Sequence, residues 1–427
     1  MREMKDSGIE FIGLIPVNWE IRRMKSLGNV RNGLSYSPQD VTDKENGTLV
    51  LRSSNIKNGK LCFTDNVYVS CNIPADLQVQ NGDILICSRN GSRELIGKNA
   101  IIENVCASFG AFMMIFRCET PNYLYYILNS PVFSYYLGSF STSTINQLTG
   151  FNFCNMKVAY CSDKGEQERI TGHLNQKCTE IDSLISDIQS QIEVLEEYKR
   201  SVITEAVTKG LDPDVEMRDS GIAWVGDIPE HWITHPLYFY FGERKNKNAL
   251  GLETNLLSLS YGKIIRKDIN SNGGLLPESF NTYNIIEKDD IIIRPTDLQN
   301  DKRSLRTGIA REHGIITSAY IAMKAIKAVN PEYFHYLLHA YDVMKVFYNM
   351  GNGVRQGLNF SEFSRLMVFE PTIEEQNAIV AYLKEKCDEI DLAIAEKKQQ
   401  IETIEEYKKS LIFEYVTGKK EVKMNEC

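Results

Sequence analysis

The chain has 427 residues, of which 43% are hydrophobic and 24% are charged, as in soluble globular proteins large enough for two or three domains. No stretch approaches the roughly eighteen apolar residues of a membrane span, and the N-terminus lacks a signal-peptide pattern. The ten cysteines form no CxxC pair or compact cluster, which argues against a disulfide framework or zinc site and favours reduced thiols in a cytosol.

The net charge of −8 is concentrated in two stretches, residues 166–209 and 374–421, each of which carries −4. The rest of the chain is therefore near neutral. This distribution fits an acidic helical spacer that faces away from DNA or towards a basic partner. Taken one by one, most of these charges are typical of a solvated helix face.

A motif near the start of the chain occurs twice. Residues 4–19 (MKDSGIEFIGLIPVNW) return as residues 217–232 (MRDSGIAWVGDIPEHW), shifted by 213 positions. We call these two segments the tryptophan motifs. Their Gly and Pro residues predict turns, and Trp19 predicts an apolar anchor. A period above two hundred residues indicates a duplicated domain and not a solenoid.

The rest of the first half predicts short strands that end in polar loops, followed by a helix. The predicted segments are strands at 48–56, 83–87 and 111–116, a polar loop at 88–93 and a helix at 121–137. Strands mixed with a helix indicate that residues 1–165 form a mixed α/β domain.

A long helix is predicted for residues 166–209, and its sequence returns at 374–421 with a shift of 209 positions. Neither stretch contains Pro, and both are almost free of Gly. Aliphatic residues recur at steps of three, four and seven, which is the narrow apolar seam of a coiled coil. Lys397 and Lys408 interrupt the second seam. The residues expected to pair the helices or dock a partner are Ile181, Ile185, Ile188, Ile192, Leu195, Ile390, Ile394, Ile401 and Ile404.

The connection after the first long helix indicates how the helices pair. Only nine residues, 208–216, precede the second tryptophan motif, and they reach about 30 Å when fully extended. A helix of some forty residues is about 60 Å long. A parallel pair would need the linker or the next domain to return over that length, whereas an antiparallel pair needs no return. We therefore predict a pseudo-twofold dumbbell with two heads on an antiparallel coiled coil.

The second half repeats the order of elements but not the loop chemistry. Residues 289–293 predict a strand and residues 331–350 the matching helix. Pro295, Thr296 and Asp297 follow the strand where the first half has its 88–93 loop. The expected fold class is α+β. The expected domains are 1–165, 166–209, 210–373 and 374–421.

The sequence contains neither a phosphate-binding Gly-rich loop nor GxGxxG after a strand. Residues 330–333 (NPEY) resemble a methyltransferase loop, but Glu replaces its second Pro, so a helix start explains them better. The Glu-Tyr-Lys triplets of the long helices, and His335 with His339, lack the additional ligands of a metal site. We expect no catalytic residue and no metal.

Polar loops rich in Arg, Asn and Ser suit base-edge hydrogen bonding, because Arg can bind guanine and Asn adenine with two bonds each. Singly, each loop is more often an ordinary surface loop. As a set they recur at equivalent places in two divergent heads, which favours DNA binding. The candidates are Arg52, Ser53, Asn55, Arg89, Asn90, Ser92, Arg93, Arg294, Thr296, Lys302, Arg303, Arg306, Arg355, Gln356 and Asn359.

These features together resemble the specificity subunit of a Type I restriction–modification system over the whole chain. The main matches are the duplicated DSGI…IP…W motif, the helix starts QERI at 167–170 and EQNAI at 375–379, and EEYK at 196–199 and 405–408. Smaller matches are GDIL at 82–85, NQLT at 146–149 and Pro371. The second head departs from the first in lacking a clear equivalent of the 89–93 loop.

The resemblance implies a non-catalytic subunit whose two target-recognition domains each read one block of a split, asymmetric site in double-stranded DNA. In such subunits the helices set the gap and dock two modification (methyltransferase) subunits, and restriction (translocase–nuclease) subunits join for cleavage. S-adenosylmethionine and ATP then belong to the partners, and no cofactor is expected on this chain. A cytoplasmic, prokaryotic location without a membrane partner follows from the same resemblance.

Two other interpretations compete with this one. A coiled-coil interaction scaffold could present two protein-binding heads without touching DNA. A fused restriction–modification polypeptide would carry its own methyltransferase or nuclease domain, and the lack of such a domain in 427 residues argues against it.

Overall fold

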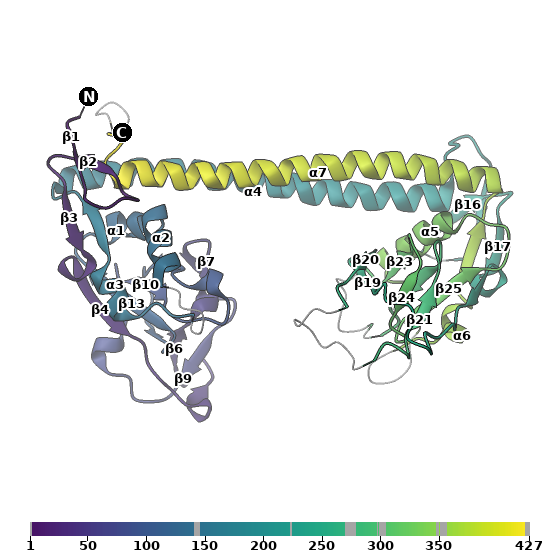
Figure 1. Ribbon diagram of the computed structural model, residues 1–427, viewed down its shortest axis with the longest axis horizontal. Helices are drawn as coiled ribbons and strands as arrows, with labels where there is room; N and C mark the ends of the chain where they lie inside the picture. Colours follow the sequence, from purple (N-terminus) through teal and green to yellow (C-terminus); the bar gives the residue numbers. More distant parts are fainter. Residues whose placement is uncertain are drawn as a thin grey trace. The chain divides into compact units, whose positions relative to one another are not determined.

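The computed structural model describes residues 2–140, 146–222, 224–269, 279–296, 298, 305–346, 350 and 357–422. The chain divides into two compact units, each with one globular head and parts of both long helices (Figure 1). Unit 1 comprises Met1–Ile188 and Lys398–Cys427, and unit 2 comprises Gln189–Lys397. Among the described residues, no helix combines the length and the apolar character that crossing a membrane requires.

Unit 1 is built on a four-stranded antiparallel sheet with the order β11-β10-β13-β4, and a second sheet, β12-β6-β9-β5, shares a hydrophobic core with it. Its strands are β1 (Met4–Asp6), β2 (Leu14–Pro16), β3 (Glu20–Arg23), β4 (Gly28–Asn32), β5 (Val41–Thr42), β6 (Thr48–Leu51), β7 (Ile56–Lys57), β8 (Lys60–Leu61), β9 (Val67–Val69), β10 (Ile84–Cys87), β11 (Asn99–Ile101), β12 (Ser108–Phe109), β13 (Met113–Cys118) and β14 (Lys157–Tyr160). Its helices are α1 (Pro121–Leu128), α2 (Pro131–Phe140), α3 (Gly150–Asn155) and the first part of α4 (Lys164–Lys209).

Strand β10 is buried on both faces. Because successive side chains of a strand point to opposite sides, its residues enter two different cores. Ile84 and Ile86 enter a core that also contains residues of α1, α2 and the long helices. Leu85 and Cys87 enter the core beneath β6 and β12. The continuous apolar run that predicted this strand therefore reflects a sheet covered on both sides.

Unit 2 repeats this sheet with the order β18-β25-β22-β23, which corresponds to β4, β13, β10 and β11 of unit 1. Its strands are β15 (Met217–Asp219), β16 (Asp227–Pro229), β17 (Ile233–Pro236), β18 (Phe241–Glu243), β19 (Leu257–Ser260), β20 (Lys263–Arg266), β21 (Asn284–Ile286), β22 (Ile291–Ile293), β23 (Thr307–Ile309), β24 (Gly314–Ile316), β25 (Ile321–Ala325) and β26 (Met367–Glu370). Its helices are α5 (Pro331–Val343), α6 (Phe360–Phe363) and the first part of α7 (Ile373–Val416). The alternation also recurs, since Ile291 and Ile293 enter one core and Ile292 the other.

Two predicted helices differ from those in the structure. The single helix expected at 121–137 is two helices, α1 and α2, separated at Asn129 and Ser130. Pro131 explains the break, because proline lacks an amide hydrogen and disfavours helical geometry in the preceding residue. The helix expected at 331–350 ends at Val343, and Lys345 has a positive φ of 59°, which a continuing helix does not allow.

Each tryptophan motif forms a hairpin, β1–β2 or β15–β16, beside a fully buried Trp19 or Trp232. A long helix ends against each motif at a glycine in the left-handed conformation: Gly418 in unit 1 (φ 69°) and Gly210 in unit 2 (φ 76°). A Cβ on Gly418 would lie 2.5 Å from the ring of Pro16, so only glycine fits there. Each tryptophan motif therefore packs against the C-terminal end of a long helix.

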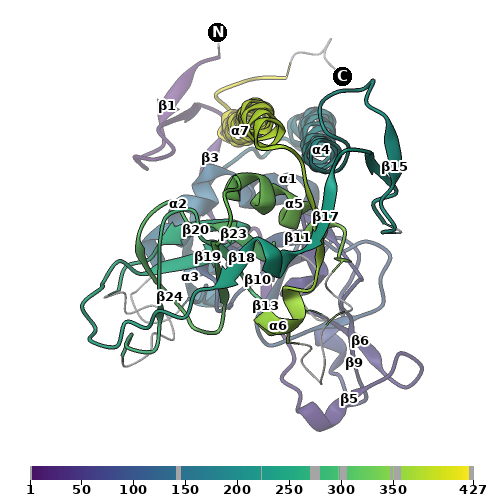
Figure 2. The same ribbon diagram turned by 90° about the vertical axis from the view of Figure 1, so that its right-hand side faces the viewer.

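Within each unit the segments of α4 and α7 run antiparallel, and Figure 2 shows the two helices side by side. In unit 1 the ring of His173 lies 4.6 Å from that of Tyr415, and Lys408 donates to Asp182 at 2.6 Å. In unit 2 Lys397 donates to Gln191 at 2.6 Å, and Lys199 donates to Asp391 at 2.6 Å. The predicted α+β fold with antiparallel long helices is confirmed.

The aliphatic residues predicted to form the seam of these helices are buried or half-buried in the structure. The buried seam residues are Ile181, Ile188, Ile192, Ile390 and Ile394, and the half-buried ones are Ile185, Leu195, Ile401 and Ile404. Lys397 and Lys408, which look like interruptions in the sequence, extend their amines across to polar partners on α4.

We expect Leu174→Ala to lower the free energy of unfolding by about 2–5 kcal/mol, because it leaves a cavity in the core that α4 and α7 share in unit 1. The control is Leu184→Ala on the same helix, whose side chain is 48% exposed and should change stability by less than about 0.5 kcal/mol. Denaturant titration followed by circular dichroism measures both. Equal losses would contradict this packing.

Candidate functional site

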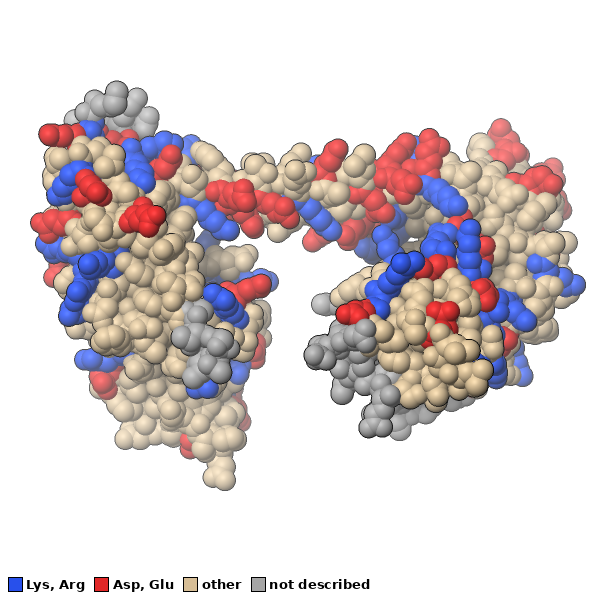
Figure 3. All heavy atoms as spheres, in the orientation of Figure 1, with Lys and Arg blue, Asp and Glu red and all other residues tan. Residues whose placement is uncertain are grey.

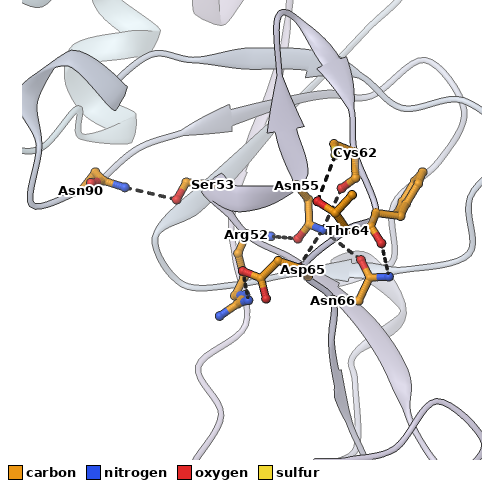
Figure 4. A network of polar contacts seen from close by, with 9 residues as sticks. Arg52, Ser53, Asn55, Cys62, Thr64, Asp65, Asn66 and Asn90 are labelled. Carbon is orange, nitrogen blue, oxygen red and sulfur yellow. Dashed lines mark hydrogen bonds and ion pairs between the residues drawn. The ribbon is translucent and has the colours of Figure 1, made fainter. Parts of the chain in front are cut away.

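Two polar loops of unit 1 meet beside its sheets (Figure 4). One follows β6 at residues 52–55, and the other follows β10 at residues 89–93. Asn90 Nδ2 donates to Ser53 Oγ at 3.1 Å, and Lys98 Nζ donates to the Ser53 carbonyl at 3.3 Å. The structure therefore brings together two segments that are 37 positions apart in sequence.

A third segment, residues 146–149, completes this surface. The Leu148 amide donates to the Ser88 carbonyl at 2.8 Å, and Asn146 Nδ2 donates to the Gly91 carbonyl at 3.3 Å. Thr149 then caps helix α3. We call residues 52–55, 89–93 and 146–149 the unit 1 loop surface.

Arg89, Ser92 and Arg93 are exposed on this surface. The Arg89 guanidinium lies 5.3 Å from the centroid of the Phe112 ring, whose side chain is 58% exposed. Such a cation–π contact holds the guanidinium while leaving its hydrogens available. The sequence placed Phe112 inside a strand, but β13 starts one residue later, and Phe112 is a functional candidate that sequence reasoning missed.

Asn55 is fully buried, and this corrects its assignment to DNA binding. Its Oδ1 accepts from the Arg52 amide at 2.9 Å, and its Nδ2 donates to the carbonyls of Cys62 (3.0 Å) and Asp65 (3.2 Å) and to Asn66 Oδ1 (3.1 Å; Figure 4). No edge of this amide is left for a base. Asn55 instead fixes the turn that carries its neighbours.

Arg52 pairs with Asp65 at 2.9 Å, and its side chain remains 36% exposed. An exposed ion pair of this kind contributes only about 0–1 kcal/mol. A phosphate or a base could therefore replace Asp65 at small cost, and Arg52 and Ser53 stay candidates.

Burial explains the pKa shifts of two histidines and of a cysteine beneath the loop surface. Burial lowers the pKa of His335 to about 3 and that of His339 to about 4, so both are neutral at physiological pH. Burial raises the pKa of the Cys87 thiol beneath the loop surface, which keeps it protonated. Among the described residues, no group of three His, Cys, Asp or Glu side chains could hold a metal ion.

Unit 2 has the same backbone arrangement with other side chains. The Leu358 amide donates to the Pro295 carbonyl at 3.0 Å, as Leu148 does to Ser88 in unit 1. Thr296 is exposed after β22, and Arg294 is half-buried. Asn359 is exposed and caps helix α6 by accepting from the Glu362 amide at 3.0 Å.

Arg306 is fully buried, so its assignment to DNA binding is also corrected. Its guanidinium donates to the Thr296 carbonyl, and its amide donates to the Asp342 carboxylate. A buried charge needs such partners, and here they tie the loop after β22 to helix α5. The other candidates of this head, Lys302, Arg303, Arg355 and Gln356, lie outside the described residues.

The chain is thus a duplicated protein with two heads: it has a sheet scaffold built twice, unlike polar loops after equivalent strands, and antiparallel segments of two long helices in each unit. No family model matches the chain. The Type I restriction enzyme MjaX specificity subunit of Methanocaldococcus jannaschii is 28% identical over 437 aligned residues, which cover 96% of each chain. The StySPI specificity subunit of Salmonella potsdam is 25% identical over 66% of this chain and 62% of its own length.

A solved chain from a study of complex assembly and conformational transition of the type I R-M system covers 94% of this chain and 98% of its own, with a TM-score of 0.65 and 12% identity. That likeness concerns the fold. The resemblance that the motifs indicated is confirmed, and the chain is a homologue of Type I restriction enzyme specificity subunits.

We expect Asn55→Ala to lower the free energy of unfolding by about 1–3 kcal/mol, because it leaves buried amide and carbonyl groups of the turn without partners. The exposed neighbour Ser54 provides the control, and Ser54→Ala should be nearly neutral. Amide hydrogen exchange should quicken at residues 52–66 in the first variant alone. Unchanged exchange there would contradict the role of Asn55.

Proposed function

We propose that this chain is the non-catalytic DNA-recognition subunit of a Type I restriction–modification complex. Its two heads each read one part of a split, asymmetric target in double-stranded DNA, and its long helices dock two methyltransferase subunits. Restriction subunits join for cleavage, and S-adenosylmethionine and ATP are bound by the partners. The observation that carries this proposal is the relationship to a specificity subunit over 96% of both chains.

The loop chemistry of unit 1 supports direct contact with DNA. Arg89 and Arg93 are exposed beside Ser92 and Asn90, a combination that can donate to bases and to phosphates. The near-neutral heads predict modest intrinsic affinity, because phosphate neutralisation drives most DNA binding. Partner subunits would supply the remainder.

The helices support the docking of partners. Figure 3 shows many Asp and Glu side chains on their exposed surface, which suits a basic partner. Tyr198 and Tyr407, equivalent residues of the repeat, are 53% and 56% exposed. Large apolar side chains outside the seam are a common feature of interfaces.

Arg89→Ala should change the methylated motif in one half only, because it removes a donor from the unit 1 loop surface and leaves unit 2 intact. Methylome sequencing of cells that carry the chain and its modification subunit provides the measurement. Lys164→Ala, which removes a 73% exposed cation at the start of α4, is the control and should leave the motif unchanged.

Three methylation outcomes discriminate the functions, and complex assembly is a separate check on the role of the loop. A split motif that depends on both chains supports the proposal, and loss of complex assembly in Arg89→Ala would show that the loop is structural. Methylation by this chain alone would reveal a fused enzyme. No new methylation with any partner would favour an interaction scaffold.

The double variant Tyr198→Ala/Tyr407→Ala should weaken binding of the modification subunit at least about tenfold while leaving the fold intact, because both rings lie outside the buried seam. Isothermal titration with the purified subunit measures this. Leu250→Ala, which removes an 82% exposed apolar side chain from the head of unit 2, is the matched control. Equal affinities of both variants would rule out a role of these two rings in docking.

A further inference from the structure

Hairpin β19–β20 of unit 2 has a turn that is disfavoured on local grounds. Its turn residues, Tyr261 and Gly262, both have positive φ, 46° and 78°, as a type I′ turn requires. The corresponding hairpin β7–β8 of unit 1 has Asn58 and Gly59 there, with φ of 51° and 72°. Asn-Gly is the favoured pair for this turn, whereas a bulky aromatic residue is strained in the left-handed region.

No structural role accounts for Tyr261. It is 84% exposed, more than any other large hydrophobic residue among those described. Within the described part of the chain, its side chain takes part in none of the observed ring contacts, hydrogen bonds or ion pairs. In unit 1 a residue of helix α1 stabilises the equivalent turn, since the Tyr125 hydroxyl donates to the Gly59 carbonyl at 3.3 Å. Strain that is retained without a packing gain is characteristic of functional positions.

The hairpin is regularly paired and packs closely against strand β23 and Leu305. Its strands pair over four residue pairs, from Leu257–Arg266 to Ser260–Lys263. Gly308 of β23 leaves room for the hairpin, because a Cβ there would lie 2.6 Å from Leu259. The backbone of the turn approaches Leu305, where a Cβ on Gly262 would lie 3.1 Å from its side chain. The exposed ring is therefore carried by an ordered element and not by a loose loop.

The position of the turn relates it to the loops of the same head. Thr307, at the start of β23, pairs with Ile293, the last residue of β22. The tip of the hairpin thus lies at the sheet edge where the Thr296 loop begins, the counterpart of the unit 1 loop surface. Lys263, the first residue of β20, and Lys267, directly after this strand, are both exposed, and their charge suits a phosphate backbone.

We propose that Tyr261 contacts DNA directly, by stacking its ring on a base or deoxyribose of the half-site that unit 2 binds. This inference rests on the proposed function and adds a residue to it. In a duplex the base faces are stacked on one another, so an aromatic ring reaches one by wedging between neighbouring base pairs, whereas a deoxyribose is accessible without unstacking. A rigid hairpin beside exposed lysines combines phosphate attraction with an aromatic contact.

The test uses the complex of the full-length chain with its modification subunit, and a duplex that contains the split motif found by methylome sequencing. Tyr261→Asn removes the ring and installs the Asn-Gly turn of unit 1, so its melting temperature should equal or exceed that of the parent chain. Fluorescence anisotropy should show at least about tenfold weaker binding. The slope of log affinity against log salt should stay unchanged, because no charge is lost.

Two further variants sharpen the result. Tyr261→Phe keeps the ring and should bind as the parent does, and Leu252→Ala removes an 80% exposed apolar side chain elsewhere in the head without effect. Parental affinity in Tyr261→Asn would overturn the inference, as would loss of the modification subunit from that variant, since the ring would then contact protein. If the parent complex methylates no motif, the proposed function itself fails, which is a separate outcome.

Discussion

The antiparallel contact between α4 and α7 is the constraint on which the remaining structure depends. The pairs Asp182–Lys408 and Lys199–Asp391 are copies of one interaction, because each residue of the first pair has its repeat equivalent, 209 positions away, in the second. Exposed pairs of this kind contribute only about 0–1 kcal/mol each. Their effect is on register, since a shifted pairing would bring lysines against the isoleucine seam and leave their charge without a partner.

That pairing also determines how each head is completed. In unit 2 the chain runs without interruption from the end of α4 through Gly210 into the tryptophan motif. In unit 1 the equivalent junction joins opposite ends of the chain, because Gly418 packs on Pro16 and Trp19. Unit 1 therefore combines two segments distant in sequence, Met1–Ile188 and Lys398–Cys427, whereas unit 2 is contiguous from Gln189 to Lys397. Contacts of such high sequence separation carry a larger loop-closure cost.

The sequence was informative where a physical signal repeats and ambiguous where one residue type serves two purposes. The duplication and the long helices follow from sequence repeats and periodicity, and strands β10 and β22 follow from their apolar runs. The burial of Asn55 and Arg306 could not be predicted from the sequence. A polar side chain in a loop can either satisfy buried backbone groups or face a ligand, and only the fold decides which. Lys408 was ambiguous for a related reason, since its partner Asp182 is 226 positions away.

The two heads also show how one scaffold can carry different polar loops. The contacts they share are buried or run between backbone groups. The Leu148–Ser88 and Leu358–Pro295 amide bonds do not depend on side-chain identity. The buried carboxylates of Asp83 and Asp290 each bind an arginine, but the arginines come from different places in the sheet. Asp83 binds Arg117 of β13, and Asp290 binds Arg244, the residue after β18.

Equivalent exposed positions, in contrast, carry different side chains in the two units. Arg89 in unit 1 stands where Thr296 stands in unit 2, and Asn58 stands where Tyr261 stands. Because the scaffold is held by backbone and core, these side chains can change without loss of the fold. Divergence of the loops on a duplicated sheet is therefore consistent with the proposed function, in which the two heads read unlike sequences.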